Sequence, residues 1–304
     1  LEYNEEEIIV TCGAKSAIYS ALTSILSPDD EVVLITPFWV SFKAIPMMIG
    51  AKIIEVKMKK PFGLDEEALK RAISERTKVI VVNNPHNPTG WIFTKEELML
   101  IRDLAIDHDL LVLSDEVDWA YVYERKHISI ASLPDMKDRT LLIDSFSKVF
   151  AMTGWRVGFA AGPKHIVDGI LTIQQHSTSG PSTFAQKGCV RILSRAEELV
   201  GDIVRTCRKN RDLVVKEISE IEGIECPKPP GAFCVFPTAE KLGLNGTELM
   251  FKLLEYGVII APGELFGEDF KYHFRICYAM PENLAREGLK RMKSFFQQLK
   301  RGVK

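Results

Sequence analysis

Side chains suited to catalysis follow strand-like stretches at three points of the chain. A Val-rich stretch runs into the turn-forming sequence Asn-Asn-Pro-His-Asn-Pro-Thr-Gly at residues 83–90. The next stretch ends in Ser-Asp-Glu, which includes Asp115, and a third runs into Ser-Phe-Ser-Lys, which ends at Lys148. Arg156 follows eight residues later inside Gly-Trp-Arg-Val-Gly. Small hydroxyls, a lysine and an arginine suit a phosphate group on a carbonyl compound that the lysine binds covalently.

Each of these segments alone has an ordinary structural explanation. The loop 83–90 could be a rigid turn between a strand and a helix. An isolated Asp115 is most often a solvated strand end, and a lone Lys148 is usually a solvated charge. The functional interpretation depends on their common position, because open α/β sheets bind ligands at the carboxyl ends of their strands.

A further candidate lies near the start, where Thr-Cys-Gly-Ala-Lys-Ser (residues 11–16) opens a helical pattern. The segment is not a nucleotide P-loop, because Ala14 stands where that motif needs glycine. The chain also has no Gly-x-Gly-x-x-Gly dinucleotide fingerprint. A glycine at the start of a helix nevertheless makes a phosphate seat from free backbone N–H groups.

The elements that must position these residues alternate between strands and helices. Apolar runs predict strands at 31–36, 53–58, 78–83, 110–114, 140–144 and 155–161, and helical spacing predicts helices at 14–26, 65–74 and 94–108. Thr94 and Glu97 form a capping box at the start of the last helix. The pattern predicts an α/β fold with a mostly parallel sheet sandwiched by helices.

The last third of the chain has a different pattern. One long charged helix is expected over 194–221, followed by strands at 232–236, 257–261 and 273–278 and a closing amphipathic helix at 282–300. We expect a large cofactor-binding domain at 1–200 and a smaller α+β C-terminal domain at 201–304, with the long helix as the hinge.

Composition excludes several classes of protein. The 304 residues include 39 basic and 41 acidic side chains, so nothing in the overall charge favours nucleic acid or an anionic membrane. The six cysteines show no metal-binding or disulfide spacing. No signal peptide or apolar run long enough to span a membrane is evident. We therefore expect a cytoplasmic protein without a metal, a membrane or a nucleic-acid partner.

Taken together, the Asn-Pro-Thr-Gly, Ser-Asp-Glu, Ser-Phe-Ser-Lys and Gly-Trp-Arg-Val-Gly segments resemble those of fold-type I pyridoxal-phosphate enzymes of the class I/II aminotransferase family. The segments occur in the family's order, and the resemblance covers essentially the whole chain. It implies pyridoxal 5′-phosphate as cofactor and a homodimer. It also implies that this chain lacks the family's N-terminal segment, which holds part of the small domain.

The resemblance assigns a catalytic group. Lys148 matches the Schiff-base lysine, which also moves the substrate's α-proton, and Asp115 matches the carboxylate that pairs with the pyridine nitrogen. Asn87 matches the amide that hydrogen-bonds the ring's phenolic oxygen and lies in the substrate site. Arg275 matches the arginine that binds the substrate α-carboxylate.

The resemblance also assigns the remaining cofactor contacts. They are the helix start at Gly13, Ala14 and Lys15, the side-chain phosphate clamp of Ser145, Ser147 and Arg156, and Trp39, which would stack on the ring. Phe38 is the alternative to Trp39, and ordinary core packing would also explain a tryptophan there.

One position departs from the family's pattern. The family usually has a tyrosine three residues after the aspartate, where its hydroxyl donates to the phenolic oxygen, and this chain has Asp118. An ionised aspartate cannot donate and would repel a phenolate. Asp118 therefore turns away, or is protonated, or leaves the role to Tyr121.

The resemblance implies an aminotransferase that moves an amino group between an L-amino acid and a 2-oxo acid by a ping-pong mechanism. A carbon–sulfur lyase on the same scaffold is an alternative, since some of these lyases also lack the tyrosine. A truncated, non-catalytic relative that acts as a binding subunit is a third reading.

Overall fold

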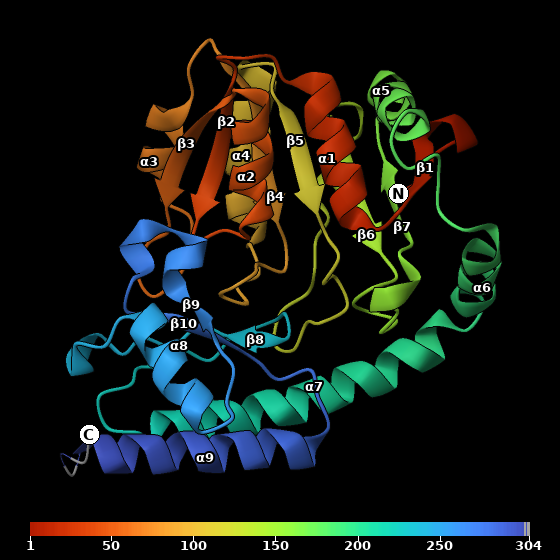
Figure 1. The fold of residues 1–304 in the computed structure, drawn as a ribbon. Coiled ribbons are helices and arrows are strands. Elements are labelled where there is room, and N and C mark those ends of the chain that lie inside the picture. The colour runs from red at the N-terminus through yellow and green to blue at the C-terminus, as the bar shows by residue number, and fades with distance from the viewer. Residues whose placement is uncertain (301, 303–304) are drawn as a thin grey trace.

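The computed structural model describes residues 1–300 and 302, and a seven-stranded sheet forms its larger layer (Figure 1). The strand order is β1-β7-β6-β5-β4-β2-β3. The pairs among β2 to β6 are parallel, whereas β7 runs antiparallel to both β6 and β1. The strands are β1 (Ile8–Thr11), β2 (Glu31–Thr36), β3 (Lys52–Lys57), β4 (Thr77–Asn83), β5 (Leu111–Asp115), β6 (Thr140–Ser145) and β7 (Gly158–Ala161). The mostly parallel sheet is therefore confirmed.

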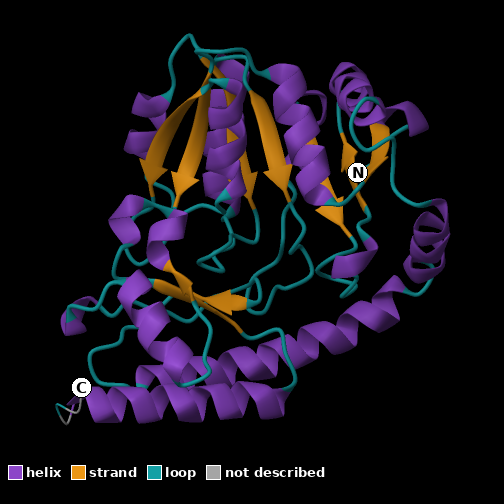
Figure 2. Cartoon of the chain, viewed as in Figure 1, coloured by secondary structure: helices purple, strands orange, loops and turns teal. Residues whose placement is uncertain are grey.

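Helices cover both faces of this sheet (Figure 2). They are α1 (Ala14–Ile25), α2 (Ser41–Ile49), α3 (Glu66–Ala72), α4 (Lys95–Asp107) and α5 (Lys164–Gln175). Alternate residues of β2 point to opposite faces, so Val32 packs with α1 and α2 and Val33 packs with α3 and α4. Both faces of the central strands are buried, which explains their continuous apolar sequences.

Most expected strands of this sheet lie within a residue or two of the observed ones. The expected strand at 155–161 is shorter, because Thr153–Trp155 form a 3₁₀ turn and Arg156 has a left-handed φ of 55°. The capping box of α4 is confirmed: the Thr94 hydroxyl accepts from the Glu97 N–H at 3.2 Å. The expectations above do not include β1, α2, α5, α6 (Thr183–Leu193) or α8 (Gly246–Glu255).

A smaller layer lies against the carboxyl ends of the parallel strands (Figure 1). Its sheet has the order β8-β10-β9, with β8 (Cys234–Val235), β9 (Ala261–Pro262) and β10 (Phe274–Cys277). The helices α7 (Ala196–Ser219) and α9 (Glu282–Lys300) pack side by side below it. The expected strand at 257–261 is wrong except for its last residue, because Gly257 follows the end of α8 with a φ of 70°. The proposed division of the chain near residue 200 stays a prediction.

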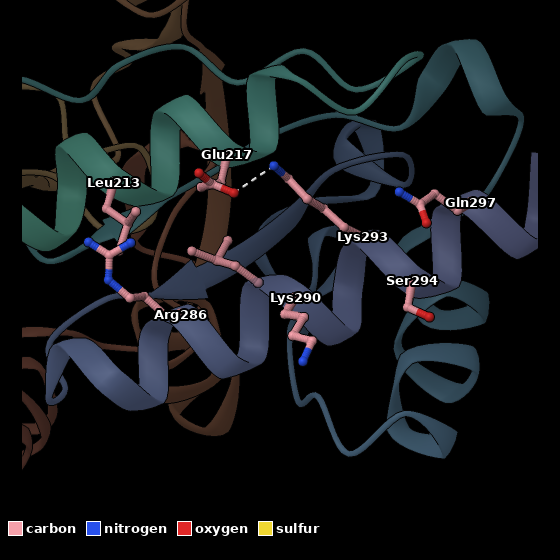
Figure 3. Close-up of a pocket in the computed structure, with 8 residues that line it drawn as sticks. Leu213, Glu217, Arg286, Lys290, Lys293, Ser294 and Gln297 are labelled. Atoms are coloured by element: carbon pink, nitrogen blue, oxygen red, sulfur yellow. Dashed lines mark hydrogen bonds and ion pairs between the residues drawn. The ribbon is translucent and has the colours of Figure 1, made fainter.

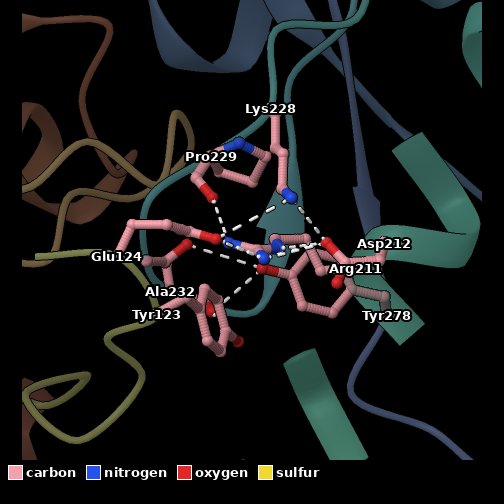
Figure 4. A network of polar contacts seen from close by, with 9 residues as sticks. Tyr123, Glu124, Arg211, Asp212, Lys228, Pro229, Ala232 and Tyr278 are labelled. Atoms are coloured by element: carbon pink, nitrogen blue, oxygen red, sulfur yellow. Dashed lines mark hydrogen bonds and ion pairs between the residues drawn. The ribbon is translucent and has the colours of Figure 1, made fainter. Parts of the chain in front are cut away.

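A buried arginine ties α7 to the loop that follows β5 (Figure 4). The Arg211 side chain is 0% exposed, and its two terminal nitrogens each donate to the Glu124 carboxylate at 2.6 Å. Asp212 and the Pro229 carbonyl accept further hydrogen bonds from the same guanidinium. The guanidinium also lies over the ring of Tyr123 at 4.4 Å from its centroid. Such a buried cation is tolerated only while its partners remain.

Replacing Glu124 by glutamine is expected to lower the free energy of unfolding by about 1–3 kcal/mol, because the buried Arg211 charge loses its bidentate partner. Asp212 and Pro229 keep their contacts, so the loss stays below that of a fully isolated charge. Urea unfolding of Glu124→Gln measures the effect. Glu66→Gln, which removes an exposed pair with Lys70, should leave the midpoint almost unchanged. Equal midpoints for both variants would contradict the prediction.

Candidate active site

A cavity of about 290 Å³ opens at the carboxyl ends of β4, β5 and β6, next to the start of α1. Its volume lies near the lower end of the range for small-molecule sites, about 300–1,000 Å³. The lining side chains come from segments far apart in the sequence: Ala14, Lys15, Trp39, Asn83, Asn87, Asp115, Val117, Asp118, Ser145, Ser147, Lys148, Thr153 and Arg156. Nine of the eleven predicted site residues therefore lie on one cavity. Gly13 and Arg275 are not among the lining residues, but each contacts one that is.

One end of the cavity is built to attract an anion. It includes the N-terminus of α1, whose first backbone N–H groups have no carbonyl within the helix to bind. Gly13 precedes this helix with a φ of 88°, and a Cβ there would clash with the Arg156 guanidinium. The glycine thus lets Arg156 approach the helix start closely. Arg156 is held by hydrogen bonds to the carbonyls of Thr153 and Cys12 at 2.8 and 3.2 Å.

Gly158 brings β7 against the same helix start. A Cβ at this position would lie 2.7 Å from the Ala14 nitrogen and 2.9 Å from the Asp144 carbonyl oxygen. Both contacts are with backbone atoms, so no side chain could move aside to make room. The second glycine of Gly-Trp-Arg-Val-Gly is therefore a packing requirement that fixes Arg156 beside α1.

Asp115 lies at the end of β5 and is only 4% exposed. Its Oδ1 accepts from the backbone N–H of Val117 at 3.2 Å. Burial raises the pKa of this carboxyl to about 7, since removing it from water disfavours its charged form. The Asn83 side chain donates to the Asp115 carbonyl at 3.1 Å and thereby braces β4 against β5. A cation brought against Asp115 would favour its ionised form.

Lys148 follows β6 and faces the cavity from the loop that continues the strand. Its Nζ lies 5.1 Å from the centroid of the Phe233 ring. The Tyr121 hydroxyl donates to the Lys148 backbone carbonyl at 2.9 Å, which holds the lysine's main chain in place. Ser145, three residues earlier, accepts from the Ser147 N–H at 3.3 Å and shapes the turn between them.

Asp118 is a second carboxyl in the same cavity and is 2% exposed. Within the described part of the chain, its Oδ1 is buried without a hydrogen-bond partner. Asp118 does not turn away from the site, so one of the three possibilities left by the sequence is wrong.

Arg275 reaches the site through Asn87. Its Nη1 donates to the Asn87 side-chain oxygen at 2.9 Å, although β10 and the loop after β4 are 188 residues apart. The guanidinium also lies 5.0 Å from the centroid of the Phe266 ring. The backbone N–H of Asn87 donates to the Asn83 side chain at 2.7 Å. These hydrogen bonds connect β10 of the small sheet to the carboxyl end of β4 in the large sheet.

Trp39 forms an apolar wall of the cavity and makes an edge-to-face contact with Phe42 at 5.3 Å. The Lys15 ammonium lies 4.9 Å from the centroid of the Trp39 ring. Phe38 is buried in the core under α2 and does not line the cavity. The structure therefore favours Trp39 over Phe38 as the residue that faces a ligand.

Three lining residues were missed by the sequence interpretation. Asn83 is the first residue of the segment 83–90, Val117 follows Ser-Asp-Glu, and Thr153 lies between Lys148 and Arg156. Asn83 carried a usable signal, because it is the last residue of a buried strand that ends at the ligand-binding edge. Val117 and Thr153 act through backbone groups, which residue types do not reveal.

A second cavity of about 480 Å³ lies between α7 and α9 (Figure 3). Its lining includes the ion pair of Glu217 and Lys293 at 2.5 Å, and long charged side chains surround it. None of the described titratable side chains that line it is buried, so we assign no chemistry to it. No group of three or more His, Cys, Asp or Glu side chains in the described chain could hold a metal ion. No helix in residues 1–300 is both long and apolar enough to cross a membrane.

Comparison with known proteins gives a single family. The sequence profile for aminotransferase class I and II matches residues 1–292. An aspartate aminotransferase of Bacillus subtilis is 36% identical over 307 residues, which covers 98% of this chain and 78% of that protein. An aromatic-amino-acid aminotransferase of Thermococcus litoralis is 35% identical and covers 97% of this chain and 77% of its own length.

Solved structures agree with this result. An aromatic aminotransferase from Pyrococcus horikoshii superposes with a TM-score of 0.94 at 34% identity, over 99% of this chain and 82% of that one. An aspartate aminotransferase from Thermus thermophilus with maleate gives a TM-score of 0.89 at 34% identity, over 95% of this chain and 76% of that one.

Proposed function

The chain belongs to the aminotransferase class I and II family, and from this premise we propose that it uses pyridoxal 5′-phosphate to move an amino group between an L-amino acid and a 2-oxo acid. The observation that carries the proposal is the convergence of Lys148, Asp115 and the anion-binding start of α1 on one cavity. No single one of these features would suffice, because each has an ordinary structural explanation when alone.

The residues present fit this cofactor. A phosphate suits the start of α1 with Arg156, Ser145 and Ser147, where Gly13 leaves the space that a Cβ would fill. A pyridinium N–H suits the buried carboxyl of Asp115, which has no salt-bridge partner among the described residues. An aromatic ring suits the Trp39 wall, and an aldehyde carbon suits Lys148.

The chain's own groups would then act as follows. When bound, pyridoxal phosphate supplies a covalent link to the amino group and an electron sink for the Cα–H bond. The Lys148 Nζ would hold the cofactor without substrate and take the proton from the substrate's Cα when substrate is present. Asp115 would keep the ring nitrogen protonated, and Arg275 would orient the substrate through its α-carboxylate, next to Asn87.

We also propose that the working form is a homodimer. Support comes from exposed apolar side chains on α6 and the turn before β7, namely Trp155, Phe184, Val190 and Leu193, which are 51%, 72%, 70% and 54% exposed. The Trp155 and Phe184 rings meet edge to face with centroids 6.2 Å apart, so these two form a contiguous exposed apolar surface of the kind that another protein covers. Light scattering of the purified protein measures its mass in solution directly.

The test of the cofactor assignment is a covalent label. Purified protein mixed with pyridoxal phosphate should turn yellow, and reduction with borohydride followed by peptide mapping should place the cofactor on Lys148 alone. The exposed Lys164, paired with Asp168, is the internal control and should stay unlabelled. A label spread over several lysines, or none, would contradict the proposal. Ammonia released from cystathionine without any 2-oxo acid would instead favour the carbon–sulfur lyase.

A further inference from the structure

Asp118 has the features of a ligand-binding residue rather than of a structural core residue. It lines the cavity beside Asp115 and Lys148 and is 2% exposed. Its Oδ1 is buried and has no hydrogen-bond partner among the described residues. A buried carboxyl oxygen without a partner is costly, so such an atom in a ligand cavity points to a hydrogen bond made with the ligand.

The Tyr121 hydroxyl already has a hydrogen-bond partner within the protein. Its hydroxyl donates to the Lys148 backbone carbonyl at 2.9 Å, and its ring packs edge to face on Phe233. Tyr121 is not among the residues that line the cavity. Of the three possibilities for this position, only a protonated Asp118 remains compatible with donation to a ligand.

Charged groups from several elements face Asp118. Burial raises the pKa of the Asp118 carboxyl to about 7, and the neighbouring Asp115 raises it further, whereas the cations of Lys148 and Arg275 lower it. Three further titratable groups interact with the Asp118 charge: the Tyr121 hydroxyl and the thiols of Cys207 on α7 and Cys234 on β8. Burial raises the pKa of the Cys207 and Cys234 thiols to about 12, so these two stay uncharged.

A cationic ring nitrogen and the Asp115 carboxylate that pairs with it would carry opposite charges. The net charge beside Asp118 would therefore change little when the cofactor binds, and burial stays the largest influence on the pKa of Asp118.

The chemistry of the cofactor identifies the acceptor. In pyridoxal phosphate, the ring hydroxyl is next to the carbon that bonds the lysine, on the side away from the phosphate arm. A hydrogen-bond donor near Lys148 would suit this ring oxygen. Asp118 lines the same cavity as Lys148, and the Lys148 and Asp115 charges both act on its carboxyl.

We propose that Asp118 is present in the loaded site as an uncharged carboxylic acid and donates a hydrogen bond to the ring oxygen of the cofactor. The inference rests on the proposed function, because it needs pyridoxal phosphate in this cavity. It makes Asp118 the counterpart of the tyrosine that the family resemblance led us to expect at this position.

The first test compares Asp118→Asn and Asp118→Ala with the unmodified holoenzyme. The measured quantity is the pH at which the visible absorbance of the bound cofactor changes. Asparagine keeps an N–H donor and cannot ionise, so its midpoint should stay within about half a pH unit. Alanine removes the donor, so the ionised ring oxygen (a phenolate) would lose a charge-assisted hydrogen bond. The midpoint of Asp118→Ala should therefore rise by about one pH unit or more.

The direction in which the absorbance midpoint moves in the two variants distinguishes a neutral Asp118 from an ionised one. If Asp118 were ionised in the loaded site, both variants would remove a repelling negative charge and both midpoints would fall. If Asp118 did not touch the cofactor, neither midpoint would move. Either result would overturn the proposal, whereas an uncoloured unmodified protein would refute the cofactor assignment instead.

A second test uses the protein without cofactor, so it does not depend on loading. A carboxyl whose pKa is raised from about 3.9 to about 7 on folding binds more protons in the folded state between these pH values. The free energy of unfolding then falls as the pH rises through this window. Asp118→Asn should therefore gain stability relative to the unmodified protein between pH 5 and pH 8. A difference that stays flat over this range would show an ordinary, ionised aspartate and would overturn the proposal.

Discussion

Replacing Lys148 by alanine is expected to lower kcat by about 10⁴-fold, the upper end of the range for loss of a general base. The large effect is expected because one Nζ would serve twice, as the covalent anchor of the cofactor and as the group that moves the Cα proton. Lys148 follows β6, with its carbonyl held by the Tyr121 hydroxyl at 2.9 Å, whereas Lys15, the other lysine that lines the cavity, lies at the start of α1. Stopped-flow and steady-state transamination assays measure the effect.

Two controls make this result specific. Lys164→Ala removes an exposed lysine that pairs with Asp168 and should keep full activity. Added methylamine should restore part of the activity of Lys148→Ala, because a small amine can occupy the vacated space and accept the proton. A kcat of Lys148→Ala within tenfold of that of the unmodified enzyme would contradict the assignment of this residue.

The sequence analysis locates the site well because the chemistry lies at strand ends. Continuous apolar runs identify β2, β4, β5 and β6 to within a residue or so, and the residues just after them are the ones that meet at one edge of a parallel sheet. Asp115 and Lys148 could therefore be placed together before any contact was known. This placement does not require knowing the order of the strands in the sheet.

Contacts between segments distant in the sequence could not be predicted in the same way. The hydrogen bond from Arg275 to Asn87 depends on how the small sheet lies against the large one, which no local pattern encodes. The buried Arg211 is a similar case, since a charged residue in a helical pattern reads as a surface residue. The short strand β9 also escapes prediction, because two residues give no periodicity.

Asp118 shows both the use and the limit of sequence reasoning. The departure from the expected tyrosine was visible in the sequence, and so were the three ways to accommodate it. Choosing among them needed the hydroxyl contact of Tyr121 and the unpartnered oxygen of Asp118, which are properties of packing.

Replacing Asp115 by asparagine is expected to lower kcat by about 10²- to 10³-fold, the usual cost of removing one preorganised electrostatic group. The amide keeps the size of the carboxyl and can still accept from the Val117 N–H, so the end of β5 should keep its shape. What it cannot do is carry the negative charge that holds a ring nitrogen protonated. The exposed Asp168→Asn is the matched control and should be fully active.

The pH dependence of cofactor binding separates this electrostatic role from a purely structural one. Burial raises the pKa of Asp115 to about 7, so the free site gains a proton on this carboxyl as the pH falls below 7. A cationic ring nitrogen and a proton compete for the Asp115 carboxylate. The affinity for pyridoxal phosphate should therefore weaken as the pH falls from 8 to 5.5. In Asp115→Asn this part of the pH dependence should disappear, because the amide does not titrate. Identical binding profiles for the two proteins would show that Asp115 carries no charge toward the cofactor, whatever its effect on the rate.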